Sequence, residues 1–200
     1  MDLYHYSFFI ISGFYHGVNP EMGWLFSVAL SMQRESTKTI FISHLPIALG
    51  HFLSLIITIF VYYIISDFIS PKTSKLFFAL LLIGFGVYKL IDRSHFNWVK
   101  MNVTNFDLFI WSFLMASSHG AGLMLIPGFD YHGDHMIHHL EHFGLFALAV
   151  HTIAMLLTSL ILAFAVYKLI GLRILRTSWI NFDYIWSFVL IIGGLFIFFV

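Results

Sequence analysis

Six long apolar runs dominate this 200-residue chain, and each is near the roughly 20 residues that a helix needs to cross a bilayer. They lie at about 6–32, 40–65, 74–91, 106–127, 143–171 and 180–200. Only 10% of the residues are charged, whereas soluble domains carry about 25%. The pattern predicts an all-α membrane protein with about six transmembrane helices. We expect one polytopic membrane domain over residues 1–200, without a separate soluble domain.

Two of the runs are interrupted in the same way, by a small residue, a His-Gly pair, a short polar or small stretch and a proline. The first interruption contains His16 and Asn19, and the second contains His119. Glycine and proline weaken a helix. We therefore predict a break over residues 16–20, and a helix end or kink near Pro127. The first run could instead be a re-entrant pair of half-helices, which would change the span count by one.

Polar landmarks follow the same order in the two halves of the chain. His51 begins an apolar stretch in the second run, and His151 begins a similar stretch in the fifth. A glycine pair follows in the third and sixth runs (Gly84, Gly86, Gly193 and Gly194). Three spans per half would make the second half enter the membrane from the opposite side. This predicts two inverted three-helix repeats, about 1–100 and 101–200, a plan in which transporters bind substrate between the repeats.

The cationic residues predict the orientation. With six spans, eight of the ten fall in loops on one side (Arg34, Lys38, Lys89, Arg93, Lys100, Lys168, Arg173 and Arg176). Only Lys72 and Lys75 fall on the other side. Cytoplasmic loops carry an excess of Lys and Arg. We therefore expect a multi-pass protein of the cell membrane, with both termini and the 128–142 loop on the extracytoplasmic side.

The 128–142 loop concentrates imidazoles and carboxylates and has no Lys or Arg. Such donors suit borderline divalent ions such as Zn, Ni, Co or Cu(II). If the loop is helical from about residue 134, four of its histidines share one face. The alternative is a solvated polar loop. The candidate metal ligands are His132, Asp134, His135, His138, His139, Glu141 and His142.

A second set of polar residues falls inside or at the ends of the apolar runs. Neutral imidazole can bind a metal or relay protons, although a lone buried histidine is more often hydrogen-bonded packing. Glu21 is either a counter-charge for these groups or an interfacial residue, and the sequence leaves both open. The candidate substrate-binding residues are His16, Asn19, His44, His51, His119 and His151.

Other classes of function find little support. No nucleophile elbow, P-loop or dinucleotide fingerprint is present, so we expect neither an enzyme nor an organic cofactor. Residues 135–139 match one histidine box of membrane di-metal oxidases, but the box stands alone and on the outer side. The chain has no cysteine and no basic block that would indicate nucleic-acid binding.

Three motifs carry a resemblance over nearly the whole chain. They are Gly13-x-x-His16-Gly17-Val18-Asn19-Pro20-x-Met22-Gly23-Trp24, Pro46-Ile47-Ala48-Leu49-Gly50-His51 and Ser118-His119-Gly120-Ala121-Gly122. With these the chain resembles a group of uncharacterised prokaryotic integral membrane proteins and, more distantly, the lysine-exporter superfamily with its nickel/cobalt exporter branch. That resemblance implies six spans in two inverted halves. The acidic residues of the nickel/cobalt first-span motif are absent here.

The leading hypothesis is a secondary transporter that moves a divalent transition-metal ion (Ni, Co, Zn or Cu) across the cytoplasmic membrane. One alternative is an accessory or metal-handling subunit of a larger membrane enzyme complex. Another is a transporter of an organic solute. The expected partners are the lipid bilayer, the metal ion and a complex partner or a second copy of the chain.

Replacing the five histidines of the 128–142 loop by alanine distinguishes two of these hypotheses. If the loop captures a metal ion, metal uptake into proteoliposomes is expected to fall. Transport of an organic solute would not change, because it does not use these ligands. Metal uptake that is unaffected by the replacement would contradict the capture role.

Overall fold

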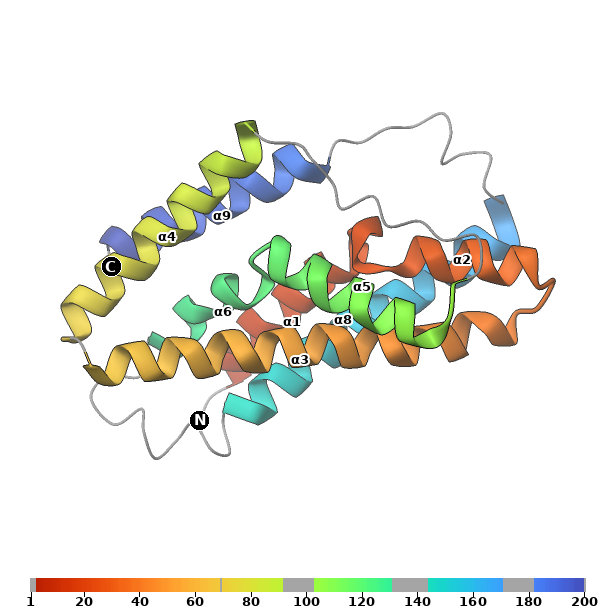
Figure 1. Cartoon of the computed structure of the whole chain (residues 1–200), viewed down its shortest axis with the longest axis horizontal. Helices are drawn as coiled ribbons and strands as arrows, with labels where there is room; N and C mark the ends of the chain where they lie inside the picture. Colours follow the sequence, from red (N-terminus) through yellow and green to blue (C-terminus); the bar gives the residue numbers. More distant parts are fainter. Residues whose placement is uncertain (1–2, 69, 92–102, 131–143, 171–181, 200) are drawn as a thin grey trace.

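The computed structural model describes residues 3–68, 70–91, 103–130, 144–170 and 182–199, and every regular element in these ranges is a helix. The all-α prediction is therefore confirmed for this part of the chain. Each of the six apolar runs corresponds to helical structure (Figure 1). The number of membrane passes and the repeat remain predictions.

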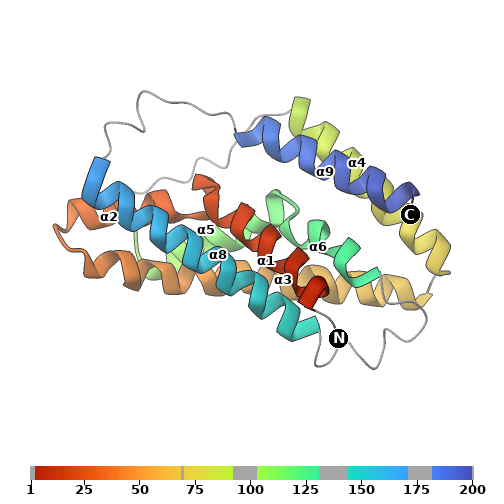
Figure 2. The ribbon, with the colours of Figure 1, turned by 180° about the vertical axis from the view of Figure 1, so that it is seen from behind.

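The first run forms two α-helices, α1 (Leu3–Val18) and α2 (Trp24–Gln33), joined by a 3₁₀ turn, η1 (Pro20–Met22). Pro20 begins the turn, and Gly23 closes it with φ +108°, a value that glycine adopts without strain. The predicted break over residues 16–20 is confirmed, since α1 ends at Val18. In Figures 1 and 2, α2 continues along the long axis in the direction of α1 and does not turn back.

The fourth run is also broken, into α5 (Asn105–Ser118) and α6 (Ala121–Asp130). The break lies at His119 and Gly120, where Gly120 has φ +66°. Its N–H donates to the Ser117 carbonyl at 3.2 Å, which is how a glycine commonly ends a helix. Helix α6 runs through Pro127 to Asp130, so the helix does not end at the proline itself, and the alternative of a kink there stays a prediction. The run is broken earlier than the proline, at Gly120, whose left-handed conformation does not occur inside an α-helix.

The other runs give longer helices. The second run is α3 (Lys38–Phe68), which stays continuous through Pro46. The third is α4 (Pro71–Ile91), and the sixth is α9 (Phe182–Phe199). The fifth is α8 (Leu145–Ala165), extended by a π-helical turn, η4 (Val166–Ile170).

Glycines let the central helices touch backbone to backbone. Helix α1 packs along α8, and α3 packs along both α5 and α8. A Cβ atom on Gly13 would lie 2.3 Å from the His151 carbonyl oxygen, and one on Gly50 would lie 2.2 Å from the Phe109 carbonyl oxygen. No side chain fits at these distances, so only glycine permits both contacts.

Helices α4 and α9 form an antiparallel pair along one side of the other helices (Figures 1 and 2). Their glycines pack reciprocally. A Cβ on Gly86 would lie 2.9 Å from the Ser187 carbonyl oxygen, and one on Gly194 would lie 2.8 Å from the Ala79 carbonyl oxygen. The pair contacts the remaining helices through an apolar cluster that also contains Tyr15, Leu123 and Met124.

Among the residues that the structure describes, two helical stretches are long and apolar enough to cross a membrane, judged by length and composition. They are Lys38–Ile65, with mean hydropathy 2.1, and Leu145–Leu169, with mean hydropathy 2.3. Only 39% and 33% of their most apolar windows are buried inside the protein. Large apolar side chains therefore face outward, such as Leu45 at 64% exposure and Ile161 at 69%.

The same substitution at two glycines tests the backbone contacts. Gly50→Ala is expected to lower the free energy of unfolding by about 1–3 kcal/mol, because the new methyl group forces α3 away from α5. Gly84→Ala is the matched control, since nothing lies within 4 Å of its Cβ position. It is expected to be neutral, or stabilising by up to about 1 kcal/mol through helix propensity. Unfolding in detergent micelles measures both, and equal effects would contradict the packing.

Candidate functional site

The break between α1 and α2 holds two polar side chains in place. The Asn19 side-chain oxygen accepts a hydrogen bond from the Glu21 N–H at 3.0 Å, so Asn19 caps η1. Asn19 is buried, whereas the Glu21 side chain is 24% exposed. Glu21 lies within η1, which directly follows this cap.

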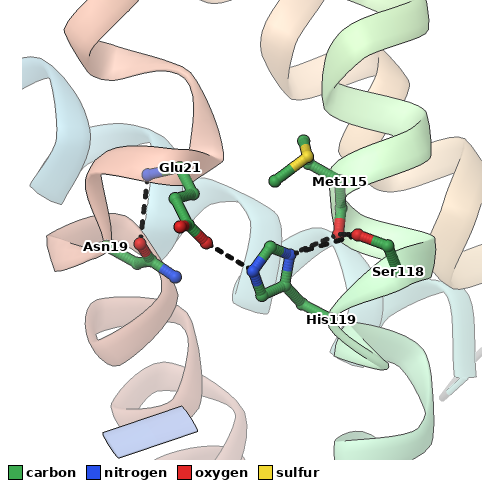
Figure 3. A network of polar contacts seen from close by, with 5 residues as sticks. All are labelled: Asn19, Glu21, Met115, Ser118 and His119. Carbon is green, nitrogen blue, oxygen red and sulfur yellow. Dashed lines mark hydrogen bonds and ion pairs between the residues drawn. The ribbon is translucent and has the colours of Figure 1, made fainter. Parts of the chain in front are cut away.

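The break between α5 and α6 brings His119 against that carboxylate. The His119 Nε2 atom contacts Oε2 of Glu21, and its Nδ1 atom lies 2.8 Å from the Met115 carbonyl oxygen (Figure 3). The His119 side chain is only 1% exposed. The two broken helices, which are far apart in the sequence, therefore meet through one carboxylate and one imidazole. We call this contact the Glu21–His119 pair.

Three further histidines come together from three different helices. His16 of α1, His51 of α3 and His151 of α8 are all fully buried. The Nε2 atoms of His51 and His151 are 3.3 Å apart. The ring of His16 has its centroid 4.9 Å from that of His151 and 5.5 Å from that of His51. We call these three residues the histidine cluster.

Hydrogen bonds set the orientation of the rings in this cluster. His16 Nδ1 lies 2.8 Å from the Ser12 carbonyl oxygen, which can only accept, so this nitrogen carries a hydrogen. Ser12 Oγ donates to the Phe9 carbonyl oxygen at 3.1 Å and lies 3.0 Å from His151 Nδ1. Ser12 therefore accepts from His151 Nδ1. This assignment leaves His151 Nε2 to accept a hydrogen bond from His51 Nε2.

His44 lies apart from these groups. It precedes His51 on α3 by seven residues, which is about 10 Å along the helix axis. Its Nδ1 atom lies 2.7 Å from the Ile40 carbonyl oxygen and 3.1 Å from Ser27 Oγ. Of the six predicted substrate-binding residues, the structure brings His16, His51 and His151 into one cluster, places Asn19 and His119 at the two breaks, and leaves His44 outside.

Metal ligation is a separate question. Within the described ranges, no three His, Cys, Asp or Glu side chains are grouped so that they could hold a metal ion. The histidine rings are in contact, but they do not form a ready-made metal site. The loop candidates His132, Asp134, His135, His138, His139, Glu141 and His142 lie outside the described residues.

Two residues gained importance only from the structure. Ser12 was not among the predicted site residues, although it lies four positions before His16 and so shares its helix face. Glu21 was left open between a counter-charge and an interfacial residue, and it contacts His119. The periodicity could have indicated Ser12, but no sequence signal identifies the partner of Glu21.

Comparison with known proteins adds no further constraint. No protein-family model, curated protein or solved structure matches this chain. The resemblance to the lysine-exporter superfamily therefore stays a prediction.

Removing the Ser12 hydroxyl tests the orientation of the cluster. Ser12→Ala is expected to lower the free energy of unfolding by about 1–3 kcal/mol, because it removes the Ser12 acceptor of a buried N–H on His151. Ser31→Ala is the control, since Ser31 is equally buried and its hydroxyl donates to the Ser27 carbonyl of its own helix. A Ser12 variant that is no less stable than the Ser31 variant would show that Ser12 does not hold His151.

Proposed function

We propose that this protein is a membrane transporter that carries a divalent transition-metal cation past the Glu21–His119 pair. In this proposal the chain crosses the membrane six times as two inverted repeats, and the two broken helices enclose the transport site between them. One observation carries the proposal: both helix breaks bring an ionisable side chain to the same point in the interior. Discontinuous helices that meet at a repeat interface are how many secondary transporters build their sites.

The helix contacts support the inverted repeat. Under the proposed repeat, α1 corresponds to α5 and α3 to α8, so the pairing of α1 with α8 matches that of α5 with α3. The repeat would also relate α4 to α9, and the reciprocal glycine contacts between these two helices fit that correspondence. Contacts that are related in this way are expected when two halves of a chain share one plan and pack about an approximate two-fold axis.

The outer surface and the charges support the membrane setting. Large Leu, Ile and Phe side chains are exposed on the outer surface of the helices, and they are stable there if lipid covers them. The connection between α2 and α3, bounded by Arg34 and Lys38, lies toward the same end of the long axis as η4, which contains Lys168 (Figure 1). The α3–α4 connection lies toward the other end, as do both termini. This separation fits the proposed cytoplasmic side for the more basic end.

The donor atoms support a transition-metal cation as the substrate. A carboxylate favours a cation over an anion, and imidazole favours borderline divalent metals over hard ions such as Mg²⁺. Since the described side chains do not form a complete cage, the ion would keep water ligands at this point. A partly hydrated site suits transport, because an ion that binds too tightly cannot leave.

Metal uptake by proteoliposomes tests the proposal. The chain is reconstituted, and Ni, Co, Zn, Cu and Mn ions are supplied outside one at a time. We expect uptake of at least one ion by the wild type, and uptake at the level of protein-free liposomes for His119→Ala, because the pair then lacks its imidazole donor. Glu21→Gln is expected to lose uptake as well.

Glu35→Gln is the matched control for Glu21→Gln, because Glu35 is an exposed carboxylate in the connection between α2 and α3. It is expected to transport like the wild type. Normal uptake by a folded His119→Ala variant would remove the pair from the transport path. Absence of uptake for every ion in the wild type would contradict metal transport altogether.

A further inference from the structure

We propose that Asn19 binds an oxygen atom of the transported species, and that this species is a divalent cation travelling together with an oxyanion, such as a carboxylate or sulfate. This inference rests on the proposed function, because it names what accompanies the metal ion at the same site. Asn19 is thus a specificity-determining residue. Its side-chain N–H groups face the accompanying anion, whereas Glu21 and His119 face the cation.

One hydrogen bond fixes the orientation of the Asn19 side chain. Its Oδ1 atom accepts from the backbone N–H of Glu21 at 3.0 Å. A backbone N–H can only donate, so the atom that faces it must be the amide oxygen and not the amide nitrogen. The Nδ2 atom, with its two hydrogens, therefore lies on the other branch of the amide. Figure 3 shows this nitrogen on the side of Asn19 that faces His119.

The Asn19 Nδ2 atom is a buried donor that the described part of the chain does not use. Asn19 is only 3% exposed, and no atom of the described residues accepts a hydrogen bond from Nδ2. A buried N–H₂ group without an acceptor is costly, and native proteins keep few of them. Between two helix breaks, this group offers a binding position for the acceptor atom of a ligand.

A metal ion and an amide N–H₂ group require different partners. Carboxylate and imidazole atoms hold a cation, whereas the hydrogens of an amide repel it. A divalent ion polarises the water bound to it, so that this water acts mainly as a hydrogen-bond donor and is a poor partner for an N–H group. A negatively charged oxygen accepts strongly from an amide. The donor at Asn19 therefore fits an anion better than it fits the cation or its water.

The charge at the two helix breaks favours the same pairing. Glu21 is the only Asp or Glu within residues 16–24 and 117–122. One carboxylate offsets only half the charge of a divalent ion, and uncompensated charge is costly in an apolar interior. An oxyanion that coordinates the ion would supply the missing negative charge and would also accept from Asn19 Nδ2.

Uptake of labelled anions tests this inference. Proteoliposomes with the wild type receive nickel or zinc chloride, either alone or with ¹⁴C-malonate or ³⁵S-sulfate, which distinguish an organic carboxylate from an inorganic oxyanion. We expect several-fold faster metal uptake with at least one of these anions, and entry of its label at a fixed ratio to the metal. Equal metal uptake from chloride alone, with no entry of label, would overturn the inference and leave the transport proposal intact.

The Asn19→Asp variant isolates the role of the amide hydrogens. Asp caps the Glu21 N–H as well as Asn does, but it replaces the donor by a second oxygen that repels an oxyanion. We expect loss of label entry and of the anion-dependent part of metal uptake. Label entry at the wild-type level would show that Asn19 only caps η1. The wild-type comparison stands even if this variant does not fold.

Asn105→Asp is the matched control. It makes the same chemical change at an exposed position, at the start of α5. It is expected to take up metal and labelled anion like the wild type.

Solid-state NMR observes Asn19 without any transport. The chain, labelled with ¹⁵N-asparagine, is placed in lipid bilayers, and the Asn19 side-chain amide signal is assigned by its loss in Asn19→Asp. We expect this signal to shift when zinc is added with malonate or sulfate, and to shift less with zinc chloride. If no ion is taken up in any buffer, metal transport is contradicted, and this shift still decides whether Asn19 contacts an oxyanion. No shift with either anion would overturn the inference.

Discussion

The close approach of helix backbones at glycine is the contact on which the interior depends. Gly13 and Gly17 place α1 directly against the backbone of α8, where a Cβ atom would lie within 2.3 and 2.5 Å of a carbonyl oxygen. Because Ser12 and His16 flank these contacts, their polar groups reach His151 at hydrogen-bonding or ring-contact distance. Gly50, next to His51, does the same for α3 and α5. A larger residue at Gly13 or Gly17 would separate α1 from α8 and, with them, His16 from His151.

The two helix breaks explain how a carboxylate and an imidazole can be held inside so apolar a protein. A continuous helix satisfies its own backbone groups and offers little to a polar side chain, whereas a break frees N–H and C=O groups. At the first break Asn19 binds one of the freed N–H groups, and Glu21 lies in the first turn of η1. At the second, α5 ends at its C-cap His119, Gly120 takes a positive φ, and His119 contacts Glu21. The polar groups then satisfy each other, which lowers the cost of their burial.

The positions of the helices were largely predictable, because apolar runs with few charges have few other stable forms. Helix α3 exceeds its predicted run by a few residues at each end, and α4 begins a few residues early but ends at the predicted residue. The first break lies where the His-Gly-Val-Asn-Pro stretch indicated. The second break lies at His119 and Gly120, inside the predicted interruption that contains His119, and α6 runs through Pro127. Proline and glycine both weaken a helix, so the local pattern does not decide which of them breaks it. In the structure Phe85 and Leu190, from distant helices, lie beside Gly120.

The sequence by itself determined that the chain is helical, where its helices lie, and that histidines are concentrated in its apolar runs. These properties are local, since they depend on composition and on backbone preferences of neighbouring residues. Only the tertiary structure decided that His16, His51 and His151 meet while His44 lies apart, and that Glu21 faces His119. Such contacts join residues far apart in the chain, and they follow from the rotation and depth at which helices pack. A displacement of one helical turn, which the apolar pattern tolerates, would pair different residues.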